Sequence, residues 1–326
     1  MLTSRAMGLT FLMSYPGADW QIRGAQNSFS RNKPATNPKA ALKEWLRLGD
    51  AMVKAGARIA VMRPDEKGIL TGMPYTSNLG SLFRQTQGAP FYIADSPAKH
   101  RKGEADRVAN FLKDTGVPTA RCKASWQGQS EVQILPGNRI ILSHGPRSTK
   151  EAVEELRAAV VPGARIMEVQ TKETCLFGDA TLSTLTARNG DCVLLVSSEG
   201  LASRSLPELR SFAGSYADVI PIEDPDDATK MATQSFTVGG TAFIPVGLST
   251  SFRSNLVKRG FLLEEVDLPE LLGKGGGGPR ALVNELRGLV LADEGPSYHN
   301  LRDELDRLVE KYPEKATSAK PVKEPK

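Results

Sequence analysis

A pattern of hairpin, helix and strand that recurs roughly every 50 residues is the strongest constraint on the fold of this 326-residue chain. Each clear hairpin consists of two short apolar runs joined by a turn rich in Gly, Asn or Pro. The three pairs are Val132–Leu135 with Arg139–Ser143, Ser183–Ala187 with Cys192–Val196, and Ser235–Val238 with Ala242–Val246. A helical pattern and one further apolar run follow each pair. With less distinct units earlier in the chain, the pattern predicts about five repeats, which is typical of a closed or stacked array of units.

The alternation of apolar runs and amphipathic segments continues from Leu9 to Leu291 without a break in composition, which favours one α/β domain. The remaining strand candidates are Leu9–Ser14, Arg58–Met62, Phe91–Ala94, Arg165–Val169, Val219–Ile222 and Leu262–Val266. The helix candidates are Pro38–Ala55, Gly103–Thr115, Ser148–Ala159, Leu206–Ala213, Ser251–Arg259 and Arg280–Leu291. We therefore expect a main domain over residues 1–292.

A second part, residues 293–326, has a different character. Tyr298–Tyr312 reads as a charged amphipathic helix, and Pro313–Lys326 is a tail rich in Lys, Pro and Glu that lacks the apolar residues needed to order itself. We expect this extension to be a solvated appendage, with a tether for a partner as the alternative.

Composition argues against several classes of protein. The 42 basic and 37 acidic residues alternate along helix faces, so we expect no nucleic-acid binding. No window approaches the roughly 20 apolar residues of a membrane span. The three cysteines are widely spaced and form no CxxC pair, which indicates a reducing compartment and no zinc site. We expect a cytoplasmic protein without cofactor or metal; the start of the chain, which carries Arg and lacks acids, leaves mitochondrial targeting as the alternative.

A glycine run, Gly275–Gly278, leads through Pro279 to Ala281 near the end of the α/β pattern. This segment resembles the one in which amidinotransferases, arginine deiminases and dimethylarginine dimethylaminohydrolases hold a nucleophilic Cys, at the start of their last helix. Four other segments resemble the same families in the same order: Met73–Gly80, Trp126–Val132, His144–Ser148 and Phe177–Ser183. The resemblance covers about residues 9–290 and implies a pentein-type α/β propeller of ββαβ units.

The resemblance also implies that the catalytic groups of these families are missing. Attack on a guanidinium carbon there needs a thiolate, a histidine and a carboxylate. Ala281 stands at the position of the thiol, Phe177 at that of the imidazole and Gln127 at that of the carboxylate. We therefore expect a pseudoenzyme with a binding, scaffold or subunit role, beside a protein partner or an active paralogue.

None of the three histidines, His100, His144 and His299, has the sequence context of the family histidine, and we interpret all three as surface or turn residues. Two cysteines are expected to be inert. Cys192 lies in an apolar run and reads as core, and the side chains that flank Cys122 point away from it.

Four polar residues match family positions that line the central channel: Asn78, Glu131, Arg147 and Asp179. They could hold an arginine-like small molecule without turning it over, or they could only satisfy buried backbone groups. An active enzyme remains the alternative, with Cys175 as nucleophile or with Glu131 and Asp179 as an acid–base pair.

Overall fold

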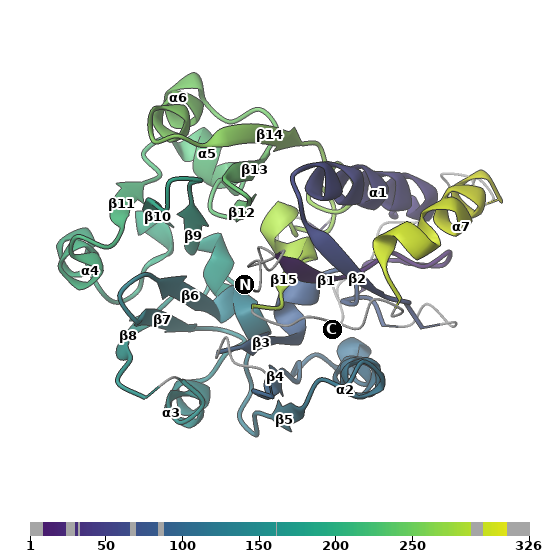
Figure 1. The fold of residues 1–326 in the computed structure, drawn as a ribbon, viewed down its shortest axis with the longest axis horizontal. Coiled ribbons are helices and arrows are strands. Elements are labelled where there is room, and N and C mark those ends of the chain that lie inside the picture. Colours follow the sequence, from purple (N-terminus) through teal and green to yellow (C-terminus); the bar gives the residue numbers. More distant parts are fainter. Residues whose placement is uncertain are drawn as a thin grey trace, which may run out of the picture.

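The computed structural model describes residues 9–23, 30–31, 33–65, 70–83, 88–160, 162–287 and 296–311. Within these residues the chain forms five three-stranded sheets, which are arranged around a common centre (Figure 1). In each sheet an antiparallel pair of strands is extended by a third strand that runs parallel to the middle one. The predicted propeller of ββαβ units is confirmed.

The hairpins predicted most clearly from the sequence form three of these units. The third unit has β6 (Val132–Leu135), β7 (Arg139–His144), α3 (Lys150–Arg157) and β8 (Arg165–Gln170). The fourth has β9 (Leu182–Thr186), β10 (Cys192–Val196), α4 (Leu206–Ala213) and β11 (Asp218–Pro221). The fifth has β12 (Phe236–Val238), β13 (Thr241–Pro245), α6 (Thr250–Lys258) and β14 (Leu262–Val266), with the short helix α5 (Pro225–Thr229) before it.

Local sequence explains several of these boundaries. Gly239 and Gly240 both have positive φ, 56° and 89°, as a two-residue hairpin turn requires. Ser205 begins α4 with a capping box, in which its side chain accepts from the Glu208 N–H and the Glu208 carboxylate accepts from the Ser205 N–H. These turns and caps thus set element boundaries through contacts between residues that are close in the sequence.

The second unit is β3 (Gly80–Leu82), β4 (Phe91–Ile93), α2 (Glu104–Asp114) and β5 (Thr119–Arg121). The first unit draws on both ends of the domain: β1 (Thr10–Ser14), α1 (Pro38–Lys54) and β2 (Arg58–Met62) are joined by β15 (Asn284–Glu285). Pairing of β15 with β1 joins the two ends of the array within one sheet.

The predicted helix Arg280–Leu291 is wrong. Pro279–Leu282 forms a short 3₁₀ helix, Asn284 and Glu285 pair with β1, and residues 288–291 lie outside the described part of the chain. The apolar spacing misled the prediction because Leu282, Val283 and Leu286 are all fully buried at the centre of the molecule. Because the whole segment is buried, apolar residues occur there whatever its secondary structure, and their spacing does not indicate one buried face of a helix.

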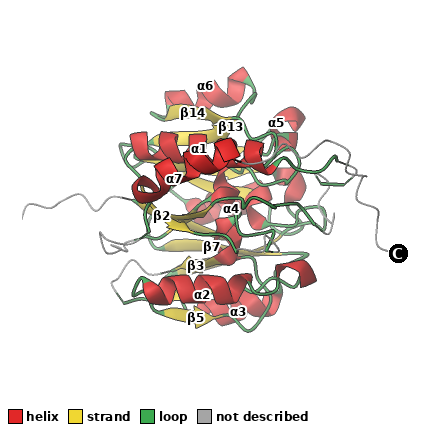
Figure 2. Cartoon of the chain, turned by 90° about the vertical axis from the view of Figure 1, so that its right-hand side faces the viewer, coloured by secondary structure: helices red, strands yellow, loops and turns green. Residues whose placement is uncertain are grey.

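The helices lie at the outer edge and the strands toward the centre (Figures 1 and 2). The innermost strands are β3, β6, β9, β12 and β15, and β6 and β12 both contact β9 there. Hydrogen bonds also join neighbouring units. The Thr184 N–H donates to the Gln133 side-chain oxygen at 3.0 Å, and the Thr186 N–H donates to the Thr237 hydroxyl at 3.2 Å.

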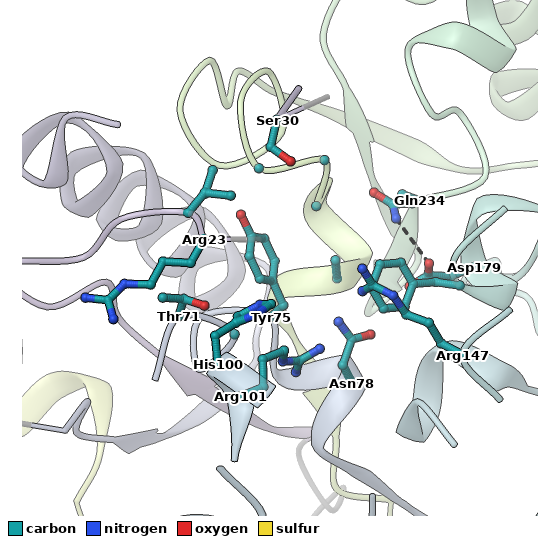
Figure 3. A pocket seen from close by; sticks show the side chains of 17 residues that line it. Arg23, Ser30, Thr71, Tyr75, Asn78, His100, Arg101, Arg147, Asp179 and Gln234 are labelled. Carbon is teal, nitrogen blue, oxygen red and sulfur yellow. Dashed lines mark hydrogen bonds between the residues drawn. The ribbon is translucent and has the colours of Figure 1, made fainter. Parts of the chain in front are cut away.

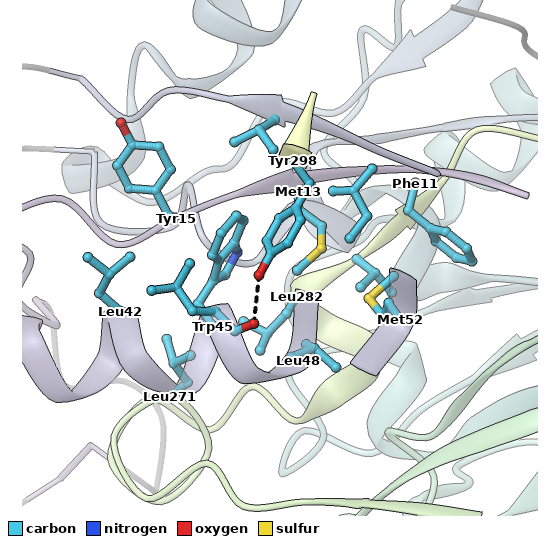
Figure 4. Packing of buried hydrophobic residues seen from close by; sticks show 14 of the residues in the cluster. Phe11, Met13, Tyr15, Leu42, Trp45, Leu48, Met52, Leu271, Leu282 and Tyr298 are labelled. Carbon is cyan, nitrogen blue, oxygen red and sulfur yellow. Dashed lines mark hydrogen bonds between the residues drawn. The ribbon is translucent and has the colours of Figure 1, made fainter. Parts of the chain in front are cut away.

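The C-terminal helix α7 (Tyr298–Lys311) packs on α1, so the expected solvated appendage is wrong for this helix. Its Tyr298, Leu301 and Leu305 are buried in the same cluster as Trp45 (Figure 4). The Tyr298 hydroxyl lies 2.9 Å from the Leu46 carbonyl oxygen. The tail Pro313–Lys326 lies outside the described residues. None of the helices in the described ranges is long and apolar enough to cross a membrane.

Candidate functional site

The candidate site lies at the N-terminal ends of the inner strands, where each unit enters the centre through a tight turn. Asn78 precedes β3, Glu131 precedes β6, Asp179 precedes β9, Gln234 precedes β12 and Ala281 precedes β15. Each of these residues lies one to three residues before its strand begins. The pseudo-symmetry of the fold brings together segments that are far apart in the sequence.

A pocket of about 70 Å³ opens at this end of the molecule. Of the residues predicted from the sequence, Asn78, Arg147, Phe177, Asp179 and Ala281 line it (Figure 3). The volume corresponds to roughly five water molecules. A group the size of a guanidinium or a carboxylate fits, and a longer ligand has to extend through the mouth or displace side chains.

Asp179 is the carboxylate of the pocket wall. Its side chain is fully buried, and one oxygen accepts a hydrogen bond from Gln234 Nε2 at 3.1 Å. The other oxygen, Oδ2, has no hydrogen-bond partner among the described residues. Burial raises the pKa of Asp179 to about 6, against the attraction of Arg280 and the hydrogen bond from Gln234. The site therefore contains a carboxyl group that can exchange a proton near neutral pH.

Gln234 joins Asp179 to the glycine run, and sequence reasoning missed it. Its side-chain oxygen accepts from the Gly278 N–H at 2.5 Å, and its main-chain oxygen accepts from the Arg280 N–H at 2.9 Å. The available signal was its place in the repeat, because Gln234 precedes β12 by the same two residues that separate Asn78 from β3.

The glycine run makes room for Tyr75. A Cβ atom on Gly275 would lie 1.8 Å from the Tyr75 hydroxyl, and one on Gly277 would lie 2.2 Å from its ring. The Tyr75 hydroxyl donates to the Leu271 carbonyl at 3.0 Å. The small glycines thus leave space for an aromatic side chain of the same chain.

Two arginines, Arg101 and Arg147, also line the pocket. Arg101 forms a buried ion pair with Glu104 at 2.7 Å. The Arg147 guanidinium lies over the Phe177 ring, 4.8 Å from its centroid. Burial, with a smaller contribution from Arg101, lowers the pKa of Arg147 to about 10, so it remains charged at neutral pH.

His100 also lines the pocket, although the sequence suggested a surface or turn residue. Burial and the neighbouring Arg101 lower its pKa, which favours the neutral imidazole. Arg101 and His100 come from the turn before α2, outside every segment that carried the family resemblance, and no local sequence signal marked them.

Gln127 and Glu131 lie behind the pocket and are not among the described residues that line it. Gln127 is fully buried and accepts from Arg101 Nη1 at 3.3 Å. Glu131 accepts from the Ser143 and Ser148 hydroxyls at 2.5 and 2.9 Å. Burial raises the pKa of Glu131 to about 7, and the serine hydrogen bonds oppose this shift. The structure therefore separates Glu131 from the other three predicted binding residues.

Cys175 lies in a neighbouring groove of about 600 Å³. Of its described lining residues, Phe177 and Gly276 also line the pocket. Burial raises the pKa of Cys122 to about 12 and that of Cys192 to about 11, so both thiols stay protonated at neutral pH. His144 lies 3.0 Å from Glu168 and does not line the pocket. No group of three or more metal-ligating side chains occurs in the ranges that the structure describes.

The arrangement can therefore hold a small polar molecule among Asp179, Arg101 and Arg147, which all line the pocket. Of the described lining residues, none is a cysteine, and Asp179 is the one carboxylate. A charged ligand would be desolvated here, which strengthens each hydrogen bond that it makes. Asp179 can also act as a proton donor or acceptor.

No protein-family model matches the sequence, and no curated protein matches it. The N-terminal domain of ArgZ bound to product, an arginine dihydrolase from the ornithine-ammonia cycle in cyanobacteria, aligns with a TM-score of 0.75 at 15% identity, covering 87% of this chain and 100% of that one. A mutant of AgrE in complex with L-arginine aligns with a TM-score of 0.73 at 20% identity, covering 89% of this chain and 41% of AgrE.

A dimethylarginine dimethylaminohydrolase in adduct with 4-chloro-2-hydroxymethylpyridine aligns with a TM-score of 0.62 at 16% identity, covering 86% of this chain and 100% of that one. All three alignments span most of this chain, so they extend over the five-unit array and not over a single ββαβ unit. By its fold, this chain is thus a pentein α/β propeller, as the sequence resemblance predicted.

Proposed function

We propose that this protein binds a small molecule with both acidic and basic groups in the central pocket, and that it does not carry out guanidine-modifying covalent chemistry. One observation carries the proposal: the methyl group of Ala281 and the ring of Phe177 line the pocket. By the sequence resemblance, these are the positions where the resembling enzymes hold a thiol and an imidazole. Neither side chain can attack a carbon atom or transfer a proton.

Charge suggests how a ligand would lie. An acidic group is favoured beside Arg101 and Arg147, and a basic group is favoured beside the unpartnered oxygen of Asp179. Amino acids with a basic side chain have this arrangement. AgrE has been crystallised with L-arginine, and also with ornithine and NAD⁺, so both amino acids are suitable first ligands to test.

The biological role would then be that of a binding subunit, scaffold or sensor in the cytoplasm, acting with a protein partner or an active paralogue. The fold tolerates the loss of catalytic groups because its stability comes from packing between units and not from the pocket side chains. A ligand that binds only the folded state would raise the apparent stability by about 2.7 kcal/mol at 100 times its Kd.

A paired assay tests the proposal. The natural protein and the triple variant Ala281→Cys, Phe177→His, Gln127→Glu are incubated with arginine, methylarginines and agmatine, while ammonia and ureido product are measured. We expect ligand-dependent thermal stabilisation in the natural protein and turnover only in the triple variant. A variant with Ala281→Ser in place of Ala281→Cys is the matched control, because it adds a polar group of similar size with a far weaker nucleophile.

Turnover by the natural protein would overturn the proposal, and so would a lack of stabilisation by every arginine-like ligand. One alternative has an observation in its favour. Asp179, with a pKa near 6 and an unpartnered oxygen, could serve as an acid–base group without a covalent intermediate. In that case Asp179→Asn would abolish the turnover, whereas Cys175→Ala would leave it unchanged.

A further inference from the structure

A second and larger cavity, of about 750 Å³, lies at the other ends of the inner strands. Along β9 the chain runs from Asp179 in the first pocket to Thr184 and Thr186 in this cavity. Along β15 it runs from Ala281 to Glu285. The two sites therefore lie at opposite ends of the propeller centre and share no described lining residue. The volume is within the range of about 300–1,000 Å³ that is typical of small-molecule sites.

Basic side chains outnumber acidic ones in this cavity. Its described lining includes Lys54 and Arg188 at the exposed rim and Arg280 and Arg287 further in, against Glu285 as the one acid. Arg287 and Glu285 neutralise each other in an ion pair of 3.0 Å. The cavity consequently has a surplus of positive charge, which favours an anionic occupant.

Arg280 is the most deeply buried of these cations, with 8% of its surface exposed. Its side-chain hydrogen bonds within the described residues go to Gln129, at 3.0 Å to the side-chain oxygen and 3.3 Å to the main-chain oxygen. Both acceptors are neutral. Asp179 and Glu285 attract the guanidinium, but neither accepts a hydrogen bond from it within the described residues. An anion in the cavity would add a charged acceptor for Arg280.

Gln133 provides an independent indication of a ligand. It lines the cavity and is 3% exposed, and its side-chain oxygen accepts from the Thr184 N–H at 3.0 Å. This bond fixes which end of the amide is the oxygen. The amide nitrogen, Nε2, makes no hydrogen bond to any part of the chain that the structure describes. A buried donor without a partner is unfavourable unless a ligand or water accepts from it.

The remaining wall is apolar. Phe11 and Phe236 lie in edge-to-face contact, with ring centroids 5.8 Å apart, and Val132 and Ile134 line the side that β6 contributes. An inorganic ion alone would leave this apolar wall in contact with water. An acidic headgroup that carries an apolar body would use both the charge and the aromatic wall.

We propose that this cavity is a binding site for a small amphipathic organic anion. Its carboxylate or phosphate accepts hydrogen bonds from Arg280, Arg287 and Gln133, and its apolar body lies along Phe11 and Phe236. The site shares no described lining residue with the first pocket, so binding there can be tested separately from the function proposed above.

Calorimetric titration of the full chain at pH 7 and low salt tests this site, with hexanoate, hexyl phosphate, hexanol and inorganic phosphate as probes. We expect one site for hexanoate or hexyl phosphate, and which of the two binds more tightly identifies the headgroup. Hexanol lacks the charged headgroup, and inorganic phosphate lacks the apolar body. Each should bind at least about tenfold more weakly, because the loss of about 1.4 kcal/mol of binding free energy raises the Kd tenfold.

Arg280 also holds Gln129 in place, so its replacement could disturb the fold. Two variants are informative. Arg287→Gln leaves the Glu285 carboxylate without its ion-pair partner, so that this carboxylate repels an anion. The double variant Lys54→Gln, Arg188→Gln removes both cations at the rim. We expect roughly tenfold weaker binding for the first and a few-fold loss for the second. Arg210→Gln, on the exposed face of α4, is the matched control and should bind normally.

Arg147→Gln distinguishes the two sites, because Arg147 lines only the first pocket. Unchanged binding by this variant supports the second cavity. The proposal is overturned if Arg147→Gln removes binding while Arg287→Gln does not, if hexanol binds as tightly as hexanoate, or if no probe binds.

Discussion

Replacement of Asp179 by Asn should stabilise the protein at neutral pH and not at low pH. The carboxyl group is fully buried and has one unpartnered oxygen, and its pKa rises from 3.8 to about 6 in the folded state. Above pH 6 the folded protein must hold a buried charge. An amide of the same shape keeps the hydrogen bond from Gln234 and carries no charge.

The size of the effect follows from proton linkage. Between pH 3.8 and 6 the folded state binds more protons at Asp179 than the unfolded state does, so stability falls as pH rises through this window. A shift of about two pKa units at 1.36 kcal/mol each corresponds to about 3 kcal/mol. The attraction of Arg280 already lowers the folded pKa and is included in this difference.

Urea denaturation at pH 3.5 and at pH 7.5 measures the free energy of unfolding of the natural protein and of Asp179→Asn. We expect a small difference at pH 3.5 and a gain of up to about 3 kcal/mol in the variant at pH 7.5. Glu265→Gln is a control of opposite sign. The hydrogen bond from Arg253 lowers the pKa of Glu265, so this replacement should reduce stability at pH 7.5 and leave it unchanged at low pH.

The reasoning would be refuted if the free energies of unfolding of the natural protein and Asp179→Asn differed by the same amount at pH 3.5 and pH 7.5. That result would mean that the Asp179 charge is already well compensated in the folded protein. If the expected gain is observed, the chain retains a carboxylate that lowers its stability, as is common at functional sites. A basic ligand should then bind more tightly above pH 6, where Asp179 is charged.

Two further predictions concern packing. Because Tyr298 of α7 is buried in the core, Tyr298→Ala should lower the free energy of unfolding in chemical denaturation by about 3–5 kcal/mol. Tyr298→Phe removes only the hydroxyl and should lower it by about 1 kcal/mol. A loss for Tyr298→Ala no larger than that of the exposed Arg307→Ala would contradict the prediction. The added Cβ of Gly277→Ala would clash with the Tyr75 ring, so this variant should displace Tyr75, lower the free energy of unfolding by about 1–3 kcal/mol and weaken ligand binding. Gly17→Ala is the control: its Cβ meets only Pro64, at 3.5 Å, and it should have little effect in the same measurements.

The sequence by itself determined the repeating unit. Turn residues such as Gly239 and Gly240 and caps such as Ser205 act over a few residues, so they could be read without knowledge of the fold. The same local signals placed β6, β10 and β14 at their observed bounds. The repeat period and the five matched segments then predicted the propeller.

The sequence also located part of the site. Asn78, Phe177, Asp179 and Ala281 were identified from segments that resemble a known family, and all four line one pocket. Glu131 was identified in the same way but lies behind the wall, bonded to Ser143 and Ser148. A position in a motif does not fix the direction of a side chain, because that depends on the neighbouring units.

Tertiary structure alone decided the remaining features. Asn284 and Glu285 form a strand because β1, at the other end of the domain, offers an unpaired edge. The apolar face of α7 is buried because α1 lies beside it. His100 and Arg101 enter the pocket because the five units meet at one centre, and packing between units far apart in the sequence leaves no local pattern from which such a meeting could be read.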